Sequence, residues 1–221
     1  MNNSFLLAAY TITCLFLGGA NAVAQGAQGA QEAQEAIDAT PDYSGAAAII
    51  DGFHQNLIDI MKRSDELGHA GRAKELYPVL NVRMNVKALG IGAVGRRNWG
   101  QWDPTQQEQF IETFTRSMAS TYASRFKAFN GQNFIVTGHR QGPKSSVIIM
   151  TEVESPLRET TSIHYLMINK GSKWAIADIF LDGAISEVAM RRSEFSSILR
   201  NDGFDGLIEA IEQKTAARSS P

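Results

Sequence analysis

The fold of this chain is decided by the stretch Trp174-Ala-Ile-Ala-Asp-Ile-Phe-Leu-Asp-Gly-Ala-Ile-Ser-Glu-Val-Ala-Met-Arg-Arg-Ser-Glu-Phe195. Its first eight residues are predicted to form a strand whose alternate side chains point to opposite faces, and both faces are apolar. The pair Asp182-Gly183 ends the strand, and Ser186 opens a helix with an apolar side. A strand that is apolar on both faces needs cover over each face, from two protein layers or from one protein layer and an apolar guest. An apolar guest molecule is our central hypothesis.

The spacing of apolar residues divides the remaining chain into helices and strands. Asp103-Pro104-Thr105-Gln106 is a strong helix start, because Asp is an N-cap residue, Pro suits the first helical position and Gln completes a capping box. This helix is predicted to run to about Phe129 and to carry aromatic residues over a broad face. The other predicted helices are residues 44–67, 73–80, 82–94, 186–200 and 203–217, and the predicted strands are 134–138, 145–154, 161–169 and 173–181.

The order of these elements predicts the fold class. Short links containing Gly, Ser and Pro join the four strands, so neighbours in the chain should pair antiparallel as a meander. Helices precede and follow the strands. We therefore predict an α+β domain in which a curved four-stranded antiparallel sheet packs against the long aromatic helix.

The amino-terminal residues have the pattern of a secretory signal peptide. Residues 1–24 contain no charged side chain, residues 5–17 are apolar, and Ala22-Val23-Ala24 is a small-x-small cleavage site, so cleavage is expected after Ala24 or Ala22. An uncleaved anchor is the alternative. Residues 25–43 are expected to form a flexible tether, residues 44–217 the folded domain and residues 218–221 a disordered tail.

Composition and charge exclude several function classes. The sole cysteine, Cys14, lies in the signal segment, so the mature protein can have neither a disulfide nor a catalytic thiol. A net charge of −2 argues against general nucleic-acid binding. Residues 62–97 carry eight basic side chains against three acidic ones. These bases are either solvated helix faces or a basic rim that meets anionic headgroups or an acidic partner.

The motifs that suggest nucleotide or metal binding lack the required context. Gly90-Ile-Gly92-Ala-Val-Gly95 matches the dinucleotide fingerprint, but a helical pattern precedes it where that fold needs a strand, so the glycines are expected to allow a bend or close helix packing. No metal site or other cofactor is expected, because the histidines lack metal-ligand spacing; they are His54, His69, His139 and His164.

Carboxylates offer two further candidate sites. Glu152 and Glu154 share one face of a strand, either as a catalytic pair or as the solvated end of that strand. Asp178 lies on an apolar strand, either as a buried hydrogen-bonded structural group or as a catalytic acid with a raised pKa.

Several stretches together are similar to one known family. They are Gly95-Arg-Arg-Asn-Trp99, Thr105-Gln-Gln-Glu-Gln-Phe110-Ile-Glu-Thr-Phe114, Thr121-Tyr-Ala123, Lys173-Trp174-x-Ile-x-Asp178-x-x-x-x-Gly183, Arg192-Ser-Glu-Phe195 and Gly203-Phe-Asp-Gly-Leu-Ile208. Their order and spacing resemble the MlaC or toluene-tolerance family of periplasmic lipid-binding proteins, over roughly residues 45–214. The segment Ala184-Ile-Ser-Glu-Val-Ala-Met-Arg-Arg192 departs from the usual family pattern and looks like the hopanoid-biosynthesis-associated HpnM branch.

The resemblance implies a periplasmic lipid carrier without catalytic activity. It implies an NTF2-like or cystatin-like core with a helical subdomain, which holds phospholipid or a hopanoid-type lipid. As partners it implies an inner-membrane ABC-type lipid transport complex and an outer-membrane lipoprotein complex, between which the carrier shuttles lipid. The departure at residues 184–192 leaves both lipid classes open.

We predict that the guest occupies a cavity between the long helix and the sheet. The helix should contribute Phe114, Met118, Tyr122 and Phe126, the sheet Ile149, Tyr165, Met167, Trp174, Ile176 and Phe180, and the mouth Val86, Leu89 and Trp99. Two alternatives remain. One is an enzyme of the ketosteroid-isomerase kind that uses Asp178 and Tyr122, and the other is an envelope scaffold with a solid core that binds no lipid.

Overall fold

The computed structural model describes residues 43–171 and 173–219. The predicted signal peptide, almost all of the predicted tether and the last two residues of the predicted tail lie outside the described residues.

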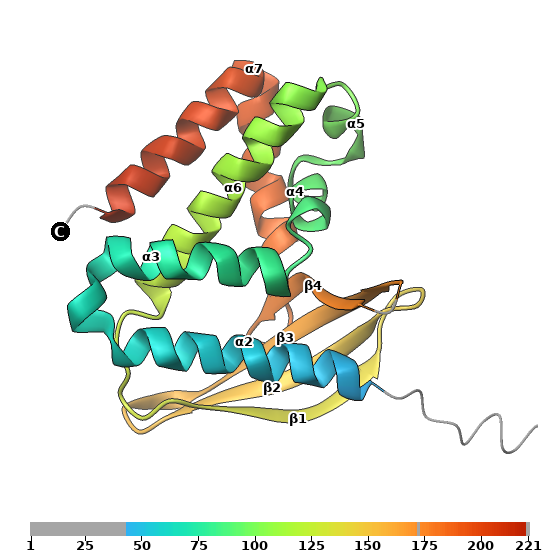
Figure 1. The fold of residues 1–221 in the computed structure, drawn as a ribbon. Coiled ribbons are helices and arrows are strands. Elements are labelled where there is room, and N and C mark those ends of the chain that lie inside the picture. Colours follow the sequence, from blue (N-terminus) through green and yellow to red (C-terminus); the bar gives the residue numbers. More distant parts are fainter. Residues whose placement is uncertain (1–42, 172, 220–221) are drawn as a thin grey trace, which may run out of the picture. The chain divides into compact units, whose positions relative to one another are not determined.

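An antiparallel meander forms the β part of the domain (Figure 1). Its strands pair in chain order, and they are β1 Asn133–Gln141, β2 Val147–Ser155, β3 Arg158–Lys170, β4 Lys173–Leu181 and β5 Ile185–Ser186. The prediction of an α+β fold with antiparallel strands is confirmed, but the prediction of four strands is wrong. The fifth strand has two residues, which pair with Phe180 and Leu181 before the last helix begins. It is too short to produce a recognisable alternation.

The register of β4 contains a bulge that the sequence pattern did not show. Leu166 of β3 pairs with Asp178, whereas the next residue, Met167, pairs with Ile176, so Ala177 is an extra residue. Beyond the bulge the two faces of β4 exchange. Ile176 and Ile179 therefore both face the core, and the predicted alternation through residues 174–180 is wrong.

The helices are α2 Ser44–Lys62, α3 Ser64–Arg83, α4 Val86–Val94, α5 Arg96–Trp99, α6 Pro104–Arg125 and α7 Glu187–Ser219. Three helices begin within one residue of the predicted positions 44, 103 and 186, but α3 begins nine residues before the predicted residue 73, and α5 was not predicted. The capping box of α6 is present, because the Asp103 side chain accepts a hydrogen bond from the Gln106 backbone N–H at 2.9 Å and the Gln106 side chain accepts one from the Asp103 N–H at 3.2 Å. Gly68 and Gly203 have positive φ and bend α3 and α7.

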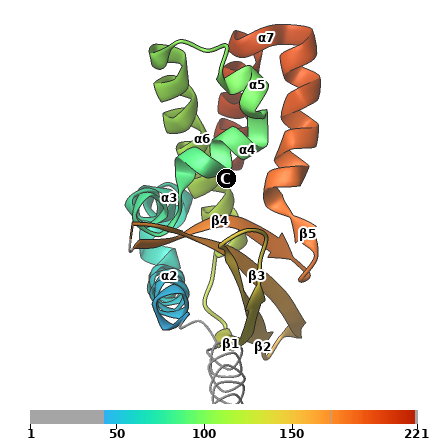
Figure 2. The same ribbon diagram turned by 90° about the vertical axis from the view of Figure 1, so that its right-hand side faces the viewer.

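The helices contact the sheet in two places, because α2 packs on β1, β2 and β4, whereas α3, α4 and α7 contact β4. α2 lies along the sheet, and α3 lies between α2 and the group formed by α4, α6 and α7 (Figures 1 and 2). One continuous apolar core joins the helices to the sheet, with Phe53 of α2, Leu80 of α3, Phe114 of α6 and Tyr165 of β3 among its members. None of the described helices is long and apolar enough to span a bilayer.

Candidate functional site

Most of the residues predicted to line a cavity are packed in the core. Nine of them are at most 6% exposed, namely Val86, Leu89, Phe114, Met118, Tyr122, Ile149, Tyr165, Met167 and Ile176. Phe53 occupies the space between α6 and the sheet, with its ring centroid 6.0 Å from that of Tyr122 and 6.2 Å from that of Tyr165. The region that the sequence analysis predicts to be hollow is therefore filled by aromatic side chains around Phe53.

The other four predicted residues lie at the edges of this core. Phe126 is half-buried and its ring contacts that of Tyr122. Phe180 pairs with His164, on the opposite face of the sheet from Ile176, because of the bulge at Ala177. Trp99 and Trp174 are half-buried and line hollows at the surface.

An open hollow of about 820 Å³, which we name the apolar groove, lies beside the core. It runs between the first turn of α2, the α3–α4 connection and the β3–β4 hairpin. Its lining is Gly45, Ile49, Asn81, Val82, Met84, Asn85, Val86, Lys87, Ile111, Ile168, Lys173, Trp174 and Ala175. Val82 is 72% exposed, so the groove presents unshielded apolar surface to water.

Backbone contacts between α3 and β4 position the floor of the apolar groove. Met84 forms a parallel bridge with Ile176, and the Asn85 N–H donates to the Ile176 carbonyl at 2.8 Å. The Asn85 side chain then caps α4 by accepting from the Ala88 N–H at 3.0 Å. The wall opposite is Trp174, which lies against Gly45; a Cβ added there would come within 3.0 Å of the indole. A larger residue at position 45 would therefore push Trp174 away from α2.

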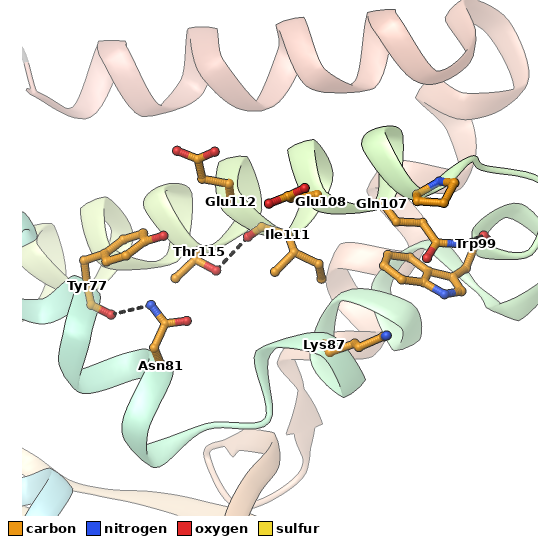
Figure 3. A pocket seen from close by; sticks show the side chains of 10 residues that line it. Tyr77, Asn81, Lys87, Trp99, Gln107, Glu108, Ile111, Glu112 and Thr115 are labelled. Atoms are coloured by element: carbon orange, nitrogen blue, oxygen red, sulfur yellow. Dashed lines mark hydrogen bonds between the residues drawn. The ribbon is translucent and has the colours of Figure 1, made fainter.

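A second hollow of about 500 Å³, the side hollow, adjoins the apolar groove through the shared residues Asn81, Lys87 and Ile111 (Figure 3). Its lining is more polar and includes Glu108 and Glu112. Trp99 closes its far end, where the Gln107 side-chain amide donates to the Trp99 carbonyl at 3.0 Å.

A third hollow, of about 830 Å³, lies on the other side of Trp99 and is named the basic hollow. It is lined by Ala88, Ile91, Gly92, Arg96, Arg97, Trp99 and Arg192. Lys87 places its ammonium 5.8 Å from the centroid of the Trp99 ring, within the range of a cation–π contact. Trp99 thus lies between the side hollow and the basic hollow, and Lys87 lies between the side hollow and the apolar groove.

The glycine motif at residues 90–95 serves helix packing, as its context predicts. A Cβ added at Gly90 would lie 2.9 Å from Ile111, and one added at Gly92 would lie 2.7 Å from Val188 of α7. Gly95 ends α4 with a φ of +83°. The first two glycines therefore let α4 approach α6 and α7 closely.

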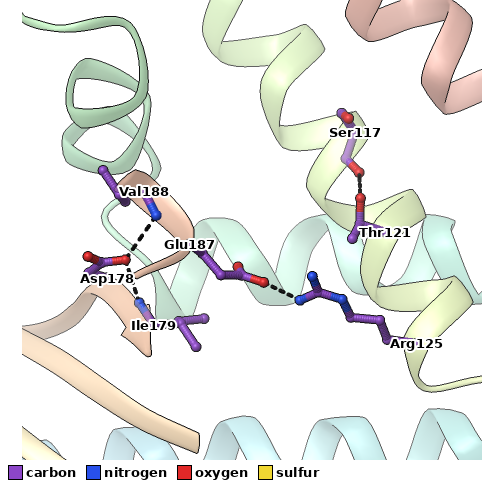
Figure 4. A network of polar contacts seen from close by, with 7 residues as sticks. All are labelled: Ser117, Thr121, Arg125, Asp178, Ile179, Glu187 and Val188. Carbon is purple, nitrogen blue, oxygen red and sulfur yellow. Dashed lines mark hydrogen bonds and ion pairs between the residues drawn. The ribbon is translucent and has the colours of Figure 1, made fainter. Parts of the chain in front are cut away.

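Asp178 has the structural role that its apolar surroundings indicated. Its carboxylate accepts hydrogen bonds from the backbone N–H groups of Ile179 at 2.8 Å and Val188 at 3.2 Å (Figure 4). It also accepts one from the Ser186 hydroxyl at 2.5 Å. These bonds join β4 to the first turn of α7, where Glu187 forms an ion pair with Arg125. The negative charges of Asp178 and Glu187 stabilise α7, because they lie at its N-terminus, where the helix dipole favours negative charge.

Two tyrosines, Tyr122 and Tyr165, are buried in the core. Burial, with a smaller contribution from the charge of Glu187, raises the pKa of Tyr122 well above its ordinary value. The Tyr165 hydroxyl lies 3.0 Å from Nε2 of His54, and burial lowers the pKa of His54 to about 4. The described residues contain no group of three or more potential ligands that could hold a metal ion.

Sequence reasoning missed much of the apolar groove, including Ile49, Val82, Lys87, Ile111 and Ile168. A signal was available for Val82. Leu76 and Leu80 share the buried side of α3, and Val82 is an apolar residue away from that side. The others could not be found from their spacing, because they lie on α2, α4, α6 and β3 and meet only in the folded chain.

Comparisons with known proteins place this fold. The structure of the phospholipid-binding protein from Ralstonia solanacearum, in complex with a phospholipid, is similar with a TM-score of 0.67 and 19% sequence identity, over 78% of this chain and 98% of that chain. No curated protein matches the sequence. The family model described as MlaC protein matches residues 51–213, which is well over half of the chain. The chain therefore belongs to the MlaC protein family.

Proposed function

We propose that this protein is a periplasmic lipid carrier that holds acyl or polycyclic hydrocarbon in the apolar groove. The observation that carries the proposal is an open, mostly apolar groove of about 820 Å³ in a chain of the MlaC family. The similar structure from Ralstonia solanacearum is described as phospholipid-binding and contains a phospholipid, which supports the same ligand class.

Hydrophobic burial alone is strong enough for such a carrier. Covering roughly 400 Å² of hydrocarbon contributes about 10 kcal/mol before the costs of association, at ~25 cal/mol per Å². Val82, Ile111 and Trp174 are among the apolar residues of the groove that such a ligand would contact. Of the residues predicted to line the site, we propose that Trp174 and the small exposed part of Val86 contact the lipid in the apolar groove, and that the other buried residues form the wall behind it. Trp99 lies outside this groove and lines the side hollow and the basic hollow.

The carrier proposal extends to location and partners. The signal-peptide pattern of residues 1–24 and membership of the MlaC family support a periplasmic location. We propose that the protein shuttles lipid between an outer-membrane lipoprotein complex and an inner-membrane ABC-type complex. The sequence of residues 184–192 supports placement in the HpnM branch, which adds a hopanoid to phospholipid as a candidate ligand.

The geometry supports binding rather than catalysis. An enzyme of the ketosteroid-isomerase kind would need Asp178 to exchange a proton with a substrate, yet both of its carboxylate oxygens accept hydrogen bonds that hold α7 on β4. Tyr122 is 3% exposed. We propose that neither residue has a catalytic role.

A vesicle transfer assay tests the proposal. Protein stripped of lipid is mixed with donor vesicles that contain a fluorescent phospholipid, separated from them, and then mixed with acceptor vesicles. A carrier removes label from the donors as a soluble complex and delivers it to the acceptors. Label that stays in the donor vesicles at every protein concentration would contradict the proposal. Repeating the assay with a fluorescent hopanoid in place of the phospholipid decides between the two lipid classes.

A further inference from the structure

The basic hollow has the composition of a site for an anionic group. Three of its seven lining residues are Arg96, Arg97 and Arg192, and no acidic residue lines it. All three arginines are exposed, and among residues 43–171 and 173–219 the structure gives none of them a carboxylate partner. Arg192 is oriented by a hydrogen bond from Nη1 to the Gly92 carbonyl at 3.2 Å. The guanidinium groups of the other two are free to meet a ligand.

The floor of the basic hollow is apolar and leads to the apolar groove. Ile91 and Trp99 line the basic hollow together with the arginines, and Trp99 also lines the side hollow. Lys87 lies over the Trp99 ring and lines both the side hollow and the apolar groove. A single amphiphile could therefore place hydrocarbon in the apolar groove and a charged group beyond Trp99.

The charges along the three hollows indicate where the headgroup of such an amphiphile would lie. Two acidic residues, Glu108 and Glu112, line the side hollow with one basic residue, Lys87, and Arg116 pairs with Glu112. The lining of the side hollow therefore has no excess of positive charge, whereas that of the basic hollow has three arginines and no acidic residue. An anionic headgroup is disfavoured beside Glu108 and favoured among the three arginines. Guanidinium groups bind phosphate oxygens with two parallel hydrogen bonds, which an ammonium cannot do.

On these grounds, and resting on the proposed lipid-binding function, we propose that Arg96, Arg97 and Arg192 bind the phosphate of a lipid headgroup and select lipids with net negative charge. A zwitterionic headgroup carries its own cation, which the arginines repel. The preference should weaken as salt screens the exposed charges.

The test compares two fluorescent lipids with the same acyl chains, phosphatidylglycerol and phosphatidylcholine, by titration against the stripped protein. The wild-type protein should bind phosphatidylglycerol more tightly. The double variant R96Q/R97Q should lose roughly fivefold of that preference, because each exposed charge pair has a modest effect and two act together. Its affinity for phosphatidylcholine should fall less than its affinity for phosphatidylglycerol, because the arginines attract the phosphate of phosphatidylcholine but repel its choline cation.

The control is R140Q/R158Q, which removes the same charge from exposed positions in β1 and β3. This variant should keep the preference for phosphatidylglycerol; an equal loss in both variants would show a general field effect and overturn the proposal. A second variant, R192Q, should also reduce the preference.

Two further outcomes separate this inference from the carrier proposal. Equal affinity of the wild-type protein for both lipids would overturn the headgroup site but leave lipid binding intact, whereas binding of neither lipid would overturn the carrier proposal as well. Calorimetry with inorganic phosphate alone gives the last check. Tight binding of phosphate that R96Q/R97Q abolishes would assign the basic hollow to free phosphate instead of a lipid.

Discussion

Replacing Val82 with asparagine should weaken lipid binding without unfolding the protein. Val82 is the second-last residue of α3, is 72% exposed and lines the apolar groove. Because water already surrounds this side chain in the free protein, the substitution should change the free energy of unfolding by less than about 0.5 kcal/mol. Its effect should appear only when a lipid covers the groove.

The size of that effect follows from the exposed fraction. Complete burial of a valine side chain contributes about 1.5–3 kcal/mol, and 72% of it remains for a lipid to cover, which leaves about 1–2 kcal/mol. Covering an asparagine amide without a hydrogen-bond partner costs about 1 kcal/mol more. Together these changes, about 2–3 kcal/mol, should raise the Kd roughly 30- to 150-fold.

The assay is titration of stripped protein with a fluorescent phospholipid. Leu157 provides a matched control, because it is also 72% exposed but lies in the turn between β2 and β3, outside the three hollows. Leu157→Asn should bind lipid like the wild-type protein. If Val82→Asn and Leu157→Asn bind within twofold of each other, the apolar groove is not the lipid site.

Three further substitutions test the structural framework. The pKa of His54 is about 4 in the folded protein and 6.5 in the unfolded chain, so the unfolded state binds more protons between these two pH values. The free energy of unfolding should therefore fall by about 3 kcal/mol as the pH drops from 6.5 to 4. Urea denaturation should show this loss in the wild-type protein, and His54→Gln should remove it. Asp178→Asn should lower the free energy of unfolding by about 1–3 kcal/mol through weaker capping of α7, with lipid affinity retained; unchanged thermal stability would contradict the capping role. Gly92→Ala should lower the free energy of unfolding by about 1–3 kcal/mol, because the new Cβ would lie 2.7 Å from the Val188 side chain. The double variant Gly92→Ala/Val188→Ala should be more stable than the sum of the two single effects predicts. Strictly additive effects would mean that the two side chains do not meet.

Local signals made much of the fold predictable. The capping box of Asp103 and Gln106 depends on residues three apart, and the alternation in the four longer strands needs no knowledge of their partners. The bulge at Ala177 is different in kind, because it exists only in the pairing of β4 with Leu166 and Met167. For that reason Phe180 lies on the face of the sheet opposite to Ile176, and not on the same face as predicted.

The site was harder to predict than the fold for a related reason. Large apolar residues such as Phe114 and Tyr165 suit the wall of a lipid cavity, but they equally suit a filled core, and periodicity cannot distinguish the two. The apolar groove arises where the Asn85 N–H meets the Ile176 carbonyl, a contact between residues far apart in the chain. The spacing of Leu76 and Leu80 indicates that Val82 is exposed, but only the structure places it in the groove beside this contact.

The central claim is that the apolar groove carries a lipid, and native mass spectrometry of protein purified without detergent tests it most directly. We predict a population in which each chain holds one lipid, and a much smaller population of this complex for Val82→Asn than for Leu157→Asn. A chain that emerges free of lipid, and that after stripping takes up neither phospholipid nor hopanoid, would contradict the claim.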